Sequence, residues 1–304
     1  MGYHAIVMET NTETSTETST ETRAETRAGG TLSCAAIQMT SSADLRDNLK
    51  RAAGLVAEAA ARGAALVVLP EMFAFIGERQ RDQLGVREAA DGGPIRDFLS
   101  EQAARHGVWL VGGTLPVESP DRDRAWALSP LVDAGGGAVA AYRKIHLFDV
   151  DLPEDGQSYR ESGTFEPGAD AVVADTPFGR VGLAVCYDLR FPEMFRLLTE
   201  MGADIIAMPS AFTAATGAAH WDPLVRARAI ENQVCVIAAN QTGRHANGKS
   251  TYGHSCIVDC WGVVRTGVSG GEGVAVAEVD FDRQRQLRRS FPCLEHRVFS
   301  VGGA

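Results

Sequence analysis

A repeated pairing of an amphipathic helical segment with a short apolar segment is the feature that most constrains the fold of this chain. Residues 44–63 carry apolar side chains at helical spacing, with Asp44 suited to cap a helix and Gly63 to end it, and the apolar run 64–71 follows. The same pairing recurs at 94–113, 191–210 and 220–240. Helices that alternate with strands predict an α/β fold.

Two further segments, residues 125–144 and 254–264, have the pattern of antiparallel hairpins. Together with the helix–strand pairs, they predict two mixed sheets covered by helices. No linker divides the chain, so we expect residues 31–304 to form one domain that begins with the strand 31–39. Residues 1–30 repeat a Thr- and Glu-rich unit with almost no apolar side chains, and we expect this tail to be disordered.

Residues 180–193, RVGLAVCYDLRFPE, predict a strand–turn–helix elbow with a cysteine at the turn. Apolar and small residues alternate up to Val185 as in a buried strand, and Pro192 suits the first turn of a helix. This geometry delivers Cys186 from an apolar strand into a polar turn. The cysteine is therefore placed as a nucleophile is.

Two other predicted strands end in a charged residue, Glu71 after 64–70 and Lys144 after 138–143. A free thiol has a pKa of about 8.5, so a nucleophilic cysteine needs a base or a cation beside it. Glu71 is suited to take the thiol proton and later to protonate the departing amine. Lys144 is suited to stabilise the charge that develops on the attacked group. The three residue types together predict hydrolysis of an amide or nitrile through a thioester on Cys186.

Three segments resemble the motifs of the nitrilase, or carbon-nitrogen hydrolase, superfamily, whose Glu-Lys-Cys triad occurs in this chain order. They are LPEMF around Glu71, YRKIHLFDVDLP around Lys144 and GLAVCYDLRFPE around Cys186, with spacings of 73 and 42 residues. The resemblance extends from about Thr31 to Arg297. It implies a single-domain, four-layer α-β-β-α sandwich, a homodimer, and neither a cofactor nor a metal. It also implies that Glu161, in YRESGTF, orients Lys144 and the substrate.

The same resemblance indicates substrate-binding residues. Arg190 lies four residues after Cys186, where a guanidinium is suited to clamp a carboxylate with two hydrogen bonds; a structural salt bridge is the alternative. Residues 209–221 resemble the substrate loop of nitrilase-like amidases that act on 2-oxo acids. Phe212 and Thr216 match residues that contact substrate there, although Phe212 is equally suited to a core. The expected partner is a small-molecule amide that bears a 2-oxo acid carboxylate.

Two amidase branches share that loop. One hydrolyses deaminated glutathione to 2-oxoglutarate and cysteinylglycine, and the other, the omega-amidase, releases ammonia from 2-oxoglutaramate. Segments 242–245, 252–255 and 287–297 resemble the first branch more closely, so we expect the first activity. Omega-amidase activity, or hydrolysis of another small amide or nitrile, is the alternative. Residues 152–162 depart from the glycine-containing loop that usually follows the lysine motif, so the rim of the pocket is expected to differ here.

One segment fits a motif from another functional class. Residues 243–250, GRHANGKS, match the phosphate-binding pattern G-x-x-x-x-G-K-[ST], with Lys249 as the residue that contacts phosphate. That pattern needs a helix directly after it, so that the helix N-terminus faces the anion. Residues 251–262 instead have the composition of loop and strand. A nucleotide-binding function is therefore the more remote alternative.

A zinc hydrolase is the remaining alternative, because zinc-bound water also cleaves amides. Cys256 and Cys260, with His254 nearby, are closely spaced, but no second Cys or His pair accompanies them. A strand would place both cysteines on one face, as in ordinary packing. We expect Cys34, Cys235 and Cys256 to be core residues.

Composition indicates which binding partners and which cellular compartment are compatible with this chain. The net charge of −10 argues against non-specific nucleic-acid binding, which needs basic patches, so an anionic substrate needs local arginines. The chain has no run of about 18 apolar residues and no apolar signal-peptide core, so we expect no membrane span and no secretion. Six scattered cysteines and a catalytic thiol suit the reducing cytoplasm.

Overall fold

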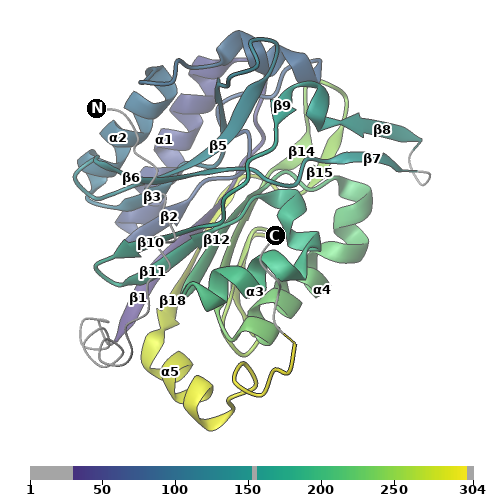
Figure 1. Ribbon diagram of the computed structural model, residues 1–304. Coiled ribbons are helices and arrows are strands. Elements are labelled where there is room, and N and C mark those ends of the chain that lie inside the picture. Colours follow the sequence, from purple (N-terminus) through teal and green to yellow (C-terminus); the bar gives the residue numbers. More distant parts are fainter. Residues whose placement is uncertain (1–29, 153–155, 300–304) are drawn as a thin grey trace, which may run out of the picture.

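The computed structural model of the chain describes residues 30–152 and 156–299. The Thr/Glu-rich segment 1–30, which the sequence predicts to be disordered, lies outside the described residues except for Gly30. Within the described ranges, two large sheets lie face to face and carry helices on their outer sides (Figure 1).

The first sheet combines strands from both ends of the described chain. Its strands run in the order β18-β1-β2-β3-β5-β4, and β6 and β9 also pair with β5. Their bounds are β1 (Thr31–Gln38), β2 (Leu66–Val68), β3 (Trp109–Val111), β4 (Leu115–Glu118), β5 (Ala125–Val132), β6 (Ala138–Arg143), β9 (Phe165–Glu166) and β18 (Gly273–Asp280). The antiparallel pairing of β5 with β6 confirms the hairpin predicted at 125–144.

The second sheet runs in the order β10-β11-β12-β13-β16-β17. Its strands are β10 (Val172–Thr176), β11 (Gly179–Leu183), β12 (Ile205–Ser210), β13 (Cys235–Asn240), β16 (Cys256–Val258) and β17 (Val264–Gly267). Strands β11, β12 and β13 are parallel, and β16 pairs antiparallel with β17 as predicted. Cys260 lies in the turn after β16, so the strand does not carry both cysteines of the 254–264 segment.

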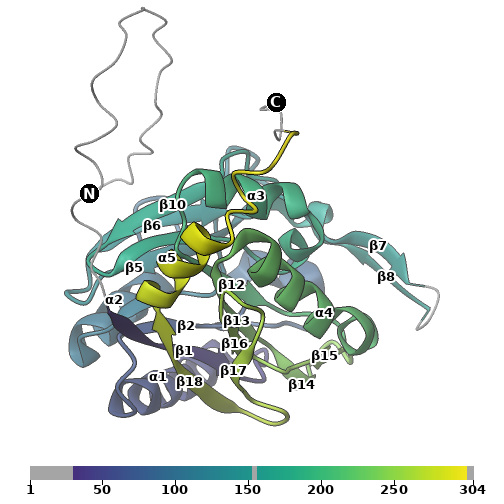
Figure 2. The same cartoon turned by 90° about the horizontal axis from the view of Figure 1, so that it is seen from below.

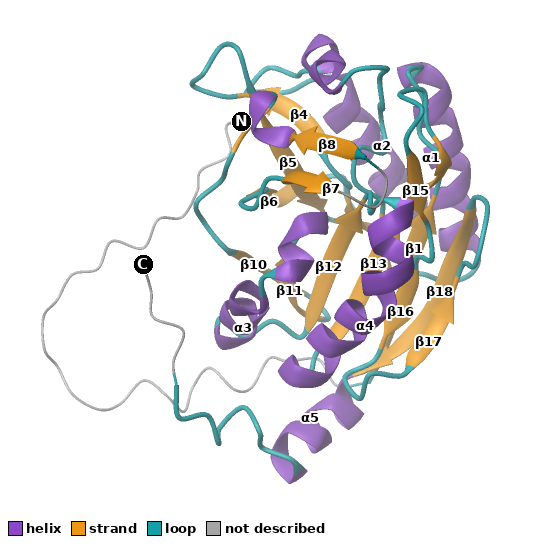
Figure 3. Cartoon of the chain, turned by 90° about the vertical axis from the view of Figure 1, so that its right-hand side faces the viewer, coloured by secondary structure: helices purple, strands orange, loops and turns teal. Residues whose placement is uncertain are grey.

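Helices cover the outer faces of the two sheets. Helices α1 (Leu45–Ala61) and α2 (Pro94–His106) lie on the first sheet, and α3 (Pro192–Glu200) and α4 (Ala214–Asn232) on the second (Figures 2 and 3). Helix α5 (Phe281–Ser290) follows β18. The arrangement confirms the four-layer α-β-β-α sandwich. Among the described residues, no helix combines the length and the apolar character that crossing a membrane requires.

Side chains of the strands alternate between two separate cores. In β1, Cys34 and Ala36 are buried in the core between the sheets, whereas Ala35 and Ile37 are buried in the core under α1 and α2. Successive side chains of a strand point to opposite faces, so a strand buried on both sides is apolar along most of its length. The apolar run 34–37 of β1 thus follows from its place between two layers.

Two helix boundaries show how local and tertiary signals combine. Asp44 caps α1 as predicted, since its Oδ1 accepts a hydrogen bond of 2.9 Å from the Asp47 N–H. Helix α4 begins at Ala214, six residues before the predicted start at His220, because Thr213 caps it. The Thr213 Oγ1 accepts a hydrogen bond of 3.3 Å from the Thr216 N–H. Much of the predicted substrate loop 209–221 is therefore helix.

Two small hairpins stand apart from the large sheets. In the first, β7 (Asp149–Leu152) pairs with β8 (Gln157–Arg160), and this hairpin projects from the body in Figures 1 and 2. In the second, β14 (Thr242–Arg244) pairs with β15 (Ser250–Tyr252), beside α4. Both hairpins contribute side chains to the pocket described next.

Candidate active site

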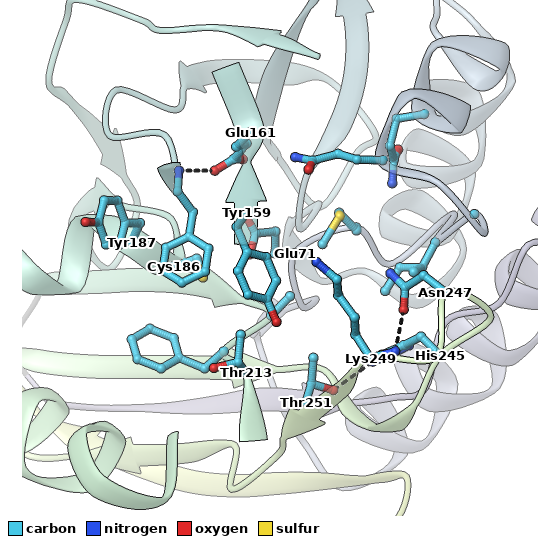
Figure 4. Close-up of a pocket in the computed structure, with 18 of the residues that line it drawn as sticks. Glu71, Tyr159, Glu161, Cys186, Tyr187, Thr213, His245, Asn247, Lys249 and Thr251 are labelled. Atoms are coloured by element: carbon cyan, nitrogen blue, oxygen red, sulfur yellow. Dashed lines mark hydrogen bonds between the residues drawn. The ribbon is translucent and has the colours of Figure 1, made fainter. Parts of the chain in front are cut away.

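Four residues that the sequence singled out meet in one pocket. Glu71 follows β2, Lys144 follows β6, Cys186 follows β11, and Glu161 begins a short 3-10 turn after β8. All four are buried and line a cavity of about 200 Å³. Figure 4 labels Glu71, Glu161 and Cys186 among the residues of this pocket. The three residues at predicted strand ends come from both sheets, although β2 ends at Val68 and Glu71 lies in the turn beyond it.

Lys144 forms the centre of the charged cluster. Its Nζ donates hydrogen bonds to Glu71 Oε1 at 2.7 Å and to Glu161 Oε1 and Oε2 at 2.8 and 2.9 Å. Burial disfavours the ammonium, but the charges of Glu161 and Glu71 outweigh burial and hold the pKa of Lys144 well above its ordinary value. Lys144 is therefore a permanent cation at neutral pH.

Glu161 is held in place from two directions. Besides Lys144, the Phe148 N–H donates to its Oε2 at 2.6 Å. Burial, together with the nearby Glu71 carboxylate, raises the pKa of Glu161, while Lys144 and the Phe148 N–H counteract the shift. The two hydrogen bonds from Lys144 therefore fix the Lys144 side chain against the Glu161 carboxylate.

The turn that carries Glu71 depends on residues far away in the chain. Gln241 Nε2 donates to the Glu71 carbonyl oxygen at 2.9 Å across 170 residues of sequence. Gly113 is also required here, since a Cβ atom on it would lie 2.1 Å from the Pro70 carbonyl oxygen. Sequence reasoning missed both residues. Gln241 and Gly113, one of 32 glycines, lie in no sequence motif that would identify them as supports of the Glu71 turn.

Cys186 occupies the predicted elbow with an unusual backbone conformation. Its φ is 47°, in the left-handed region that non-glycine residues rarely adopt. The fully buried Asp188 supports this turn, because its Oδ2 accepts hydrogen bonds from the Val185 N–H at 2.7 Å and the Tyr142 hydroxyl at 2.8 Å. His146 Nδ1 lies 2.7 Å from Asp188 Oδ1. Asp188 is a support that the sequence analysis did not identify.

The three predicted substrate residues also line the pocket. The Arg190 guanidinium lies 5.2 Å from the centroid of the Phe212 ring, and its Nη1 is 3.2 Å from His220 Nδ1. No carboxylate within the described ranges forms a salt bridge with Arg190. Phe212 is 4% exposed and packs edge-on against Trp221, so it belongs to the core and to the pocket wall at once. Thr216 reaches the pocket from the first turn of α4.

Comparison with known proteins decides the family. The sequence model of the carbon-nitrogen hydrolase family matches residues 33–289, which is most of the chain. This chain is a carbon-nitrogen hydrolase. It is 42% identical over 271 residues to the deaminated glutathione amidase of Synechocystis sp., covering 87% of this chain and 97% of that protein. It is also 42% identical over 267 residues to the deaminated glutathione amidase of Homo sapiens, covering 86% and 81%.

Solved structures show the same fold. The NitFhit protein of C. elegans superposes on this carbon-nitrogen hydrolase with a TM-score of 0.81 and 36% identity, covering 90% of this chain and 67% of that one. Nit3 of Saccharomyces cerevisiae, a member of branch 10 of the nitrilase superfamily, gives a TM-score of 0.79 with 32% identity, covering 89% and 97%. The predicted fold and family are thereby confirmed.

In this hydrolase the environment of Cys186 favours the neutral thiol over the thiolate. The pKa of Cys186 lies well above its ordinary value because of burial and the adjacent Glu71 carboxylate, and Lys144 and a backbone hydrogen bond from Ala211 offset the shift only in part. The resting thiol is therefore protonated at neutral pH. The adjacent Glu71 carboxylate, which lines the same pocket, is placed to accept this proton.

The structure does not provide the helix that a phosphate-binding loop needs. Residues 250–252 form β15, so the segment 243–250 closes a hairpin and does not open a helix. This contradicts the nucleotide-binding alternative. Cys256 is buried in the core between the sheets as predicted, and the described residues contain no group of three or more His, Cys, Asp or Glu side chains that could hold a metal ion.

Proposed function

We propose that this hydrolase cleaves deaminated glutathione to 2-oxoglutarate and cysteinylglycine through a thioester on Cys186. Relatives that are 40–42% identical over most of the chain and carry the name deaminated glutathione amidase support the substrate. The meeting of Glu71, Lys144 and Cys186 in one pocket supports the chemistry and is the structural observation that carries the proposal.

Acylation follows from the contacts in the pocket. The Cys186 Sγ attacks the amide carbon while its proton passes to the adjacent Glu71 carboxylate. The Lys144 ammonium stabilises the negative charge on the former carbonyl oxygen. Glu71 then delivers the proton to the nitrogen as the carbon–nitrogen bond breaks, and cysteinylglycine departs. The acyl group remains on Cys186 as a thioester.

Deacylation uses the same residues, and water takes the place of the amine. Glu71 takes a proton from a water molecule, whose oxygen attacks the thioester carbon. The carbon–sulfur bond then breaks, 2-oxoglutarate leaves, and Glu71 returns the proton to the Cys186 thiolate. Glu161 keeps Lys144 in position through both steps, because two of the three carboxylate oxygens bonded to the Nζ belong to Glu161.

Arg190, Phe212 and Thr216 are proposed to hold the 2-oxo acid end of the substrate. Arg190→Met is expected to lower kcat/KM for deaminated glutathione about 100-fold, since a charge-assisted bidentate pair is lost. An analogue with a carboxamide in place of the 2-oxo acid carboxylate should lose less than about threefold in the same variant. Steady-state kinetics of both substrates check this result, and equal losses would exclude the clamp.

The proposed substrate is tested by comparing kcat/KM of the purified enzyme for deaminated glutathione and for 2-oxoglutaramate. We expect at least a tenfold preference for deaminated glutathione, measured as 2-oxoglutarate released. A preference for 2-oxoglutaramate would make this protein an omega-amidase. Activity on neither substrate would reject both assignments and point to another small amide or nitrile.

We also propose a homodimer in the cytoplasm. The large side chains of Ile230, Trp261 and Phe291 are about half exposed, and the last two rings lie 6.3 Å apart, which is typical of a surface that is covered on association. All six cysteines are free, as suits a reducing compartment. Light scattering of the purified protein tests the dimer.

A further inference from the structure

We propose that Lys249 binds a second carboxylate, at the leaving-amine end of the substrate. The inference rests on the proposed function and adds a specificity determinant to the same site. In deaminated glutathione the acyl part carries the 2-oxo acid carboxylate, and the cysteinylglycine part ends in the glycine carboxylate. Lys249 thus selects amides whose leaving amine is anionic.

Lys249 points into the pocket from the β14–β15 hairpin (Figure 4). Its Nζ lies 3.5 Å from the centroid of the Tyr159 ring, which belongs to β8 in the other small hairpin. A tyrosine face attracts an ammonium group. The contact therefore holds the ammonium at the pocket wall, where a carboxylate can approach it.

Hydrogen bonds within the β14–β15 hairpin fix the backbone of Lys249. The Lys249 N–H donates to Asn247 Oδ1, and the His245 N–H donates to the Lys249 carbonyl oxygen, both at 2.9 Å. His245 is itself buried between the Ser41 carbonyl oxygen, 2.9 Å from Nδ1, and the Thr251 hydroxyl, 2.7 Å from Nε2. A carbonyl oxygen only accepts, so Nδ1 carries the proton and Nε2 accepts from Thr251. Burial lowers the pKa of His245, which keeps this ring neutral.

Two different walls of the pocket carry the two cations. Arg190 lies in the same 3-10 turn as Cys186 and packs on Phe212, whereas Lys249 packs on Tyr159. An amide is attacked at the carbon between its acyl part and its amine, so these parts extend in different directions from Cys186. With the acyl carboxylate at Arg190, the Lys249 wall is left for the amine.

The other two cationic side chains that line the pocket are poorer candidates. Lys144 lies beside Cys186 and is assigned to the charge that develops during attack. Arg79 also lines the pocket, but its side chain is 85% exposed. Solvent screens the charge of an exposed guanidinium, which therefore adds little to binding. Arg79→Met is therefore a matched control for Lys249→Met.

The test is a cycle of two enzymes and two substrates. The second substrate is deaminated glutathione with its glycine carboxylate converted to a carboxamide. For the carboxylate substrate, Lys249→Met is expected to lower kcat/KM about 10- to 100-fold, the range for a lost charge-assisted hydrogen bond. Wild type should lose the same factor on the carboxamide substrate. Lys249→Met should show less than about a twofold difference between the two substrates.

Two controls distinguish a loss of substrate binding from a general structural defect of the variant. Arg79→Met should stay within about twofold of wild type on both substrates. Lys249→Met should keep wild-type kcat/KM within about twofold on 2-oxoglutaramate, whose leaving group is ammonia. An equal loss on all three substrates would overturn the proposal and assign Lys249 a structural role.

The proposed function can fail independently of this inference. Wild type that does not hydrolyse deaminated glutathione rejects the proposed function. Wild type that hydrolyses it equally well with a carboxylate or a carboxamide end keeps the function and rejects the Lys249 subsite. Lys249→Arg, which retains the charge, should recover at least part of the discrimination between the two substrates.

Discussion

Cys186→Ser is expected to lower kcat by at least about four orders of magnitude, because enzymes lose activity on this scale when the nucleophile is removed. A hydroxyl is far less acidic than a thiol, so the Glu71 carboxylate cannot ionise it as it does Cys186. The left-handed backbone at this position and its support by Asp188 do not depend on the sulfur. The variant should therefore fold normally and fail in chemistry.

The measurement is 2-oxoglutarate release together with acid quenching of the working enzyme. Wild type should yield a peptide that contains Cys186 with the added mass of the acyl group, and the serine variant should not. Cys293→Ser is the control, since Cys293 is half-buried and does not line the pocket. Activity within about tenfold of wild type in Cys186→Ser would reject the nucleophile assignment.

Lys144→Met should combine a catalytic and a stability defect. We expect kcat to fall at least about 1000-fold with little change in KM, since the ammonium acts mainly on charge that develops in the transition state. Lys144 is 1% exposed and is bonded to two buried carboxylates. Breaking such a buried pair costs about 3–5 kcal/mol, so the free energy of unfolding should fall by that amount.

The stability defect has a predictable pH dependence. Burial already raises the pKa of Glu161 in the native protein, and removing Lys144 removes the main opposing effect. A carboxyl group whose folded-state pKa is raised binds its proton more tightly when folded, so its cost is greatest above that pKa and is relieved below it. Denaturant unfolding of Lys144→Met should show a smaller defect at pH 5 than at pH 8. The exposed Lys50→Met is the control, and an equal defect at both pH values would contradict the coupling.

Much of the fold was accessible from local patterns. The Asp44 cap, the turn at Cys186 and the hairpin at 125–144 are each formed by one continuous segment of the chain, and all three occur as predicted. The start of helix α4 was predicted wrongly. The helix begins at Ala214 because Thr213 caps it, a local signal that the sequence analysis did not use, and its contacts with β15 come from a distant part of the chain.

Local patterns in the chain supply the reactive groups: a thiol on a tight turn, and a carboxylate and an ammonium at the ends of predicted strands, in the order of the family's motifs. The packing of the two sheets controls which of these groups meet. It set the 2.7 Å contact of Lys144 with Glu71, the support of Glu71 by Gln241, and the place of Lys249 on the pocket wall. The physical reason is that propensities and capping act within a few residues, whereas the distances between these groups follow from how two sheets and their hairpins pack together.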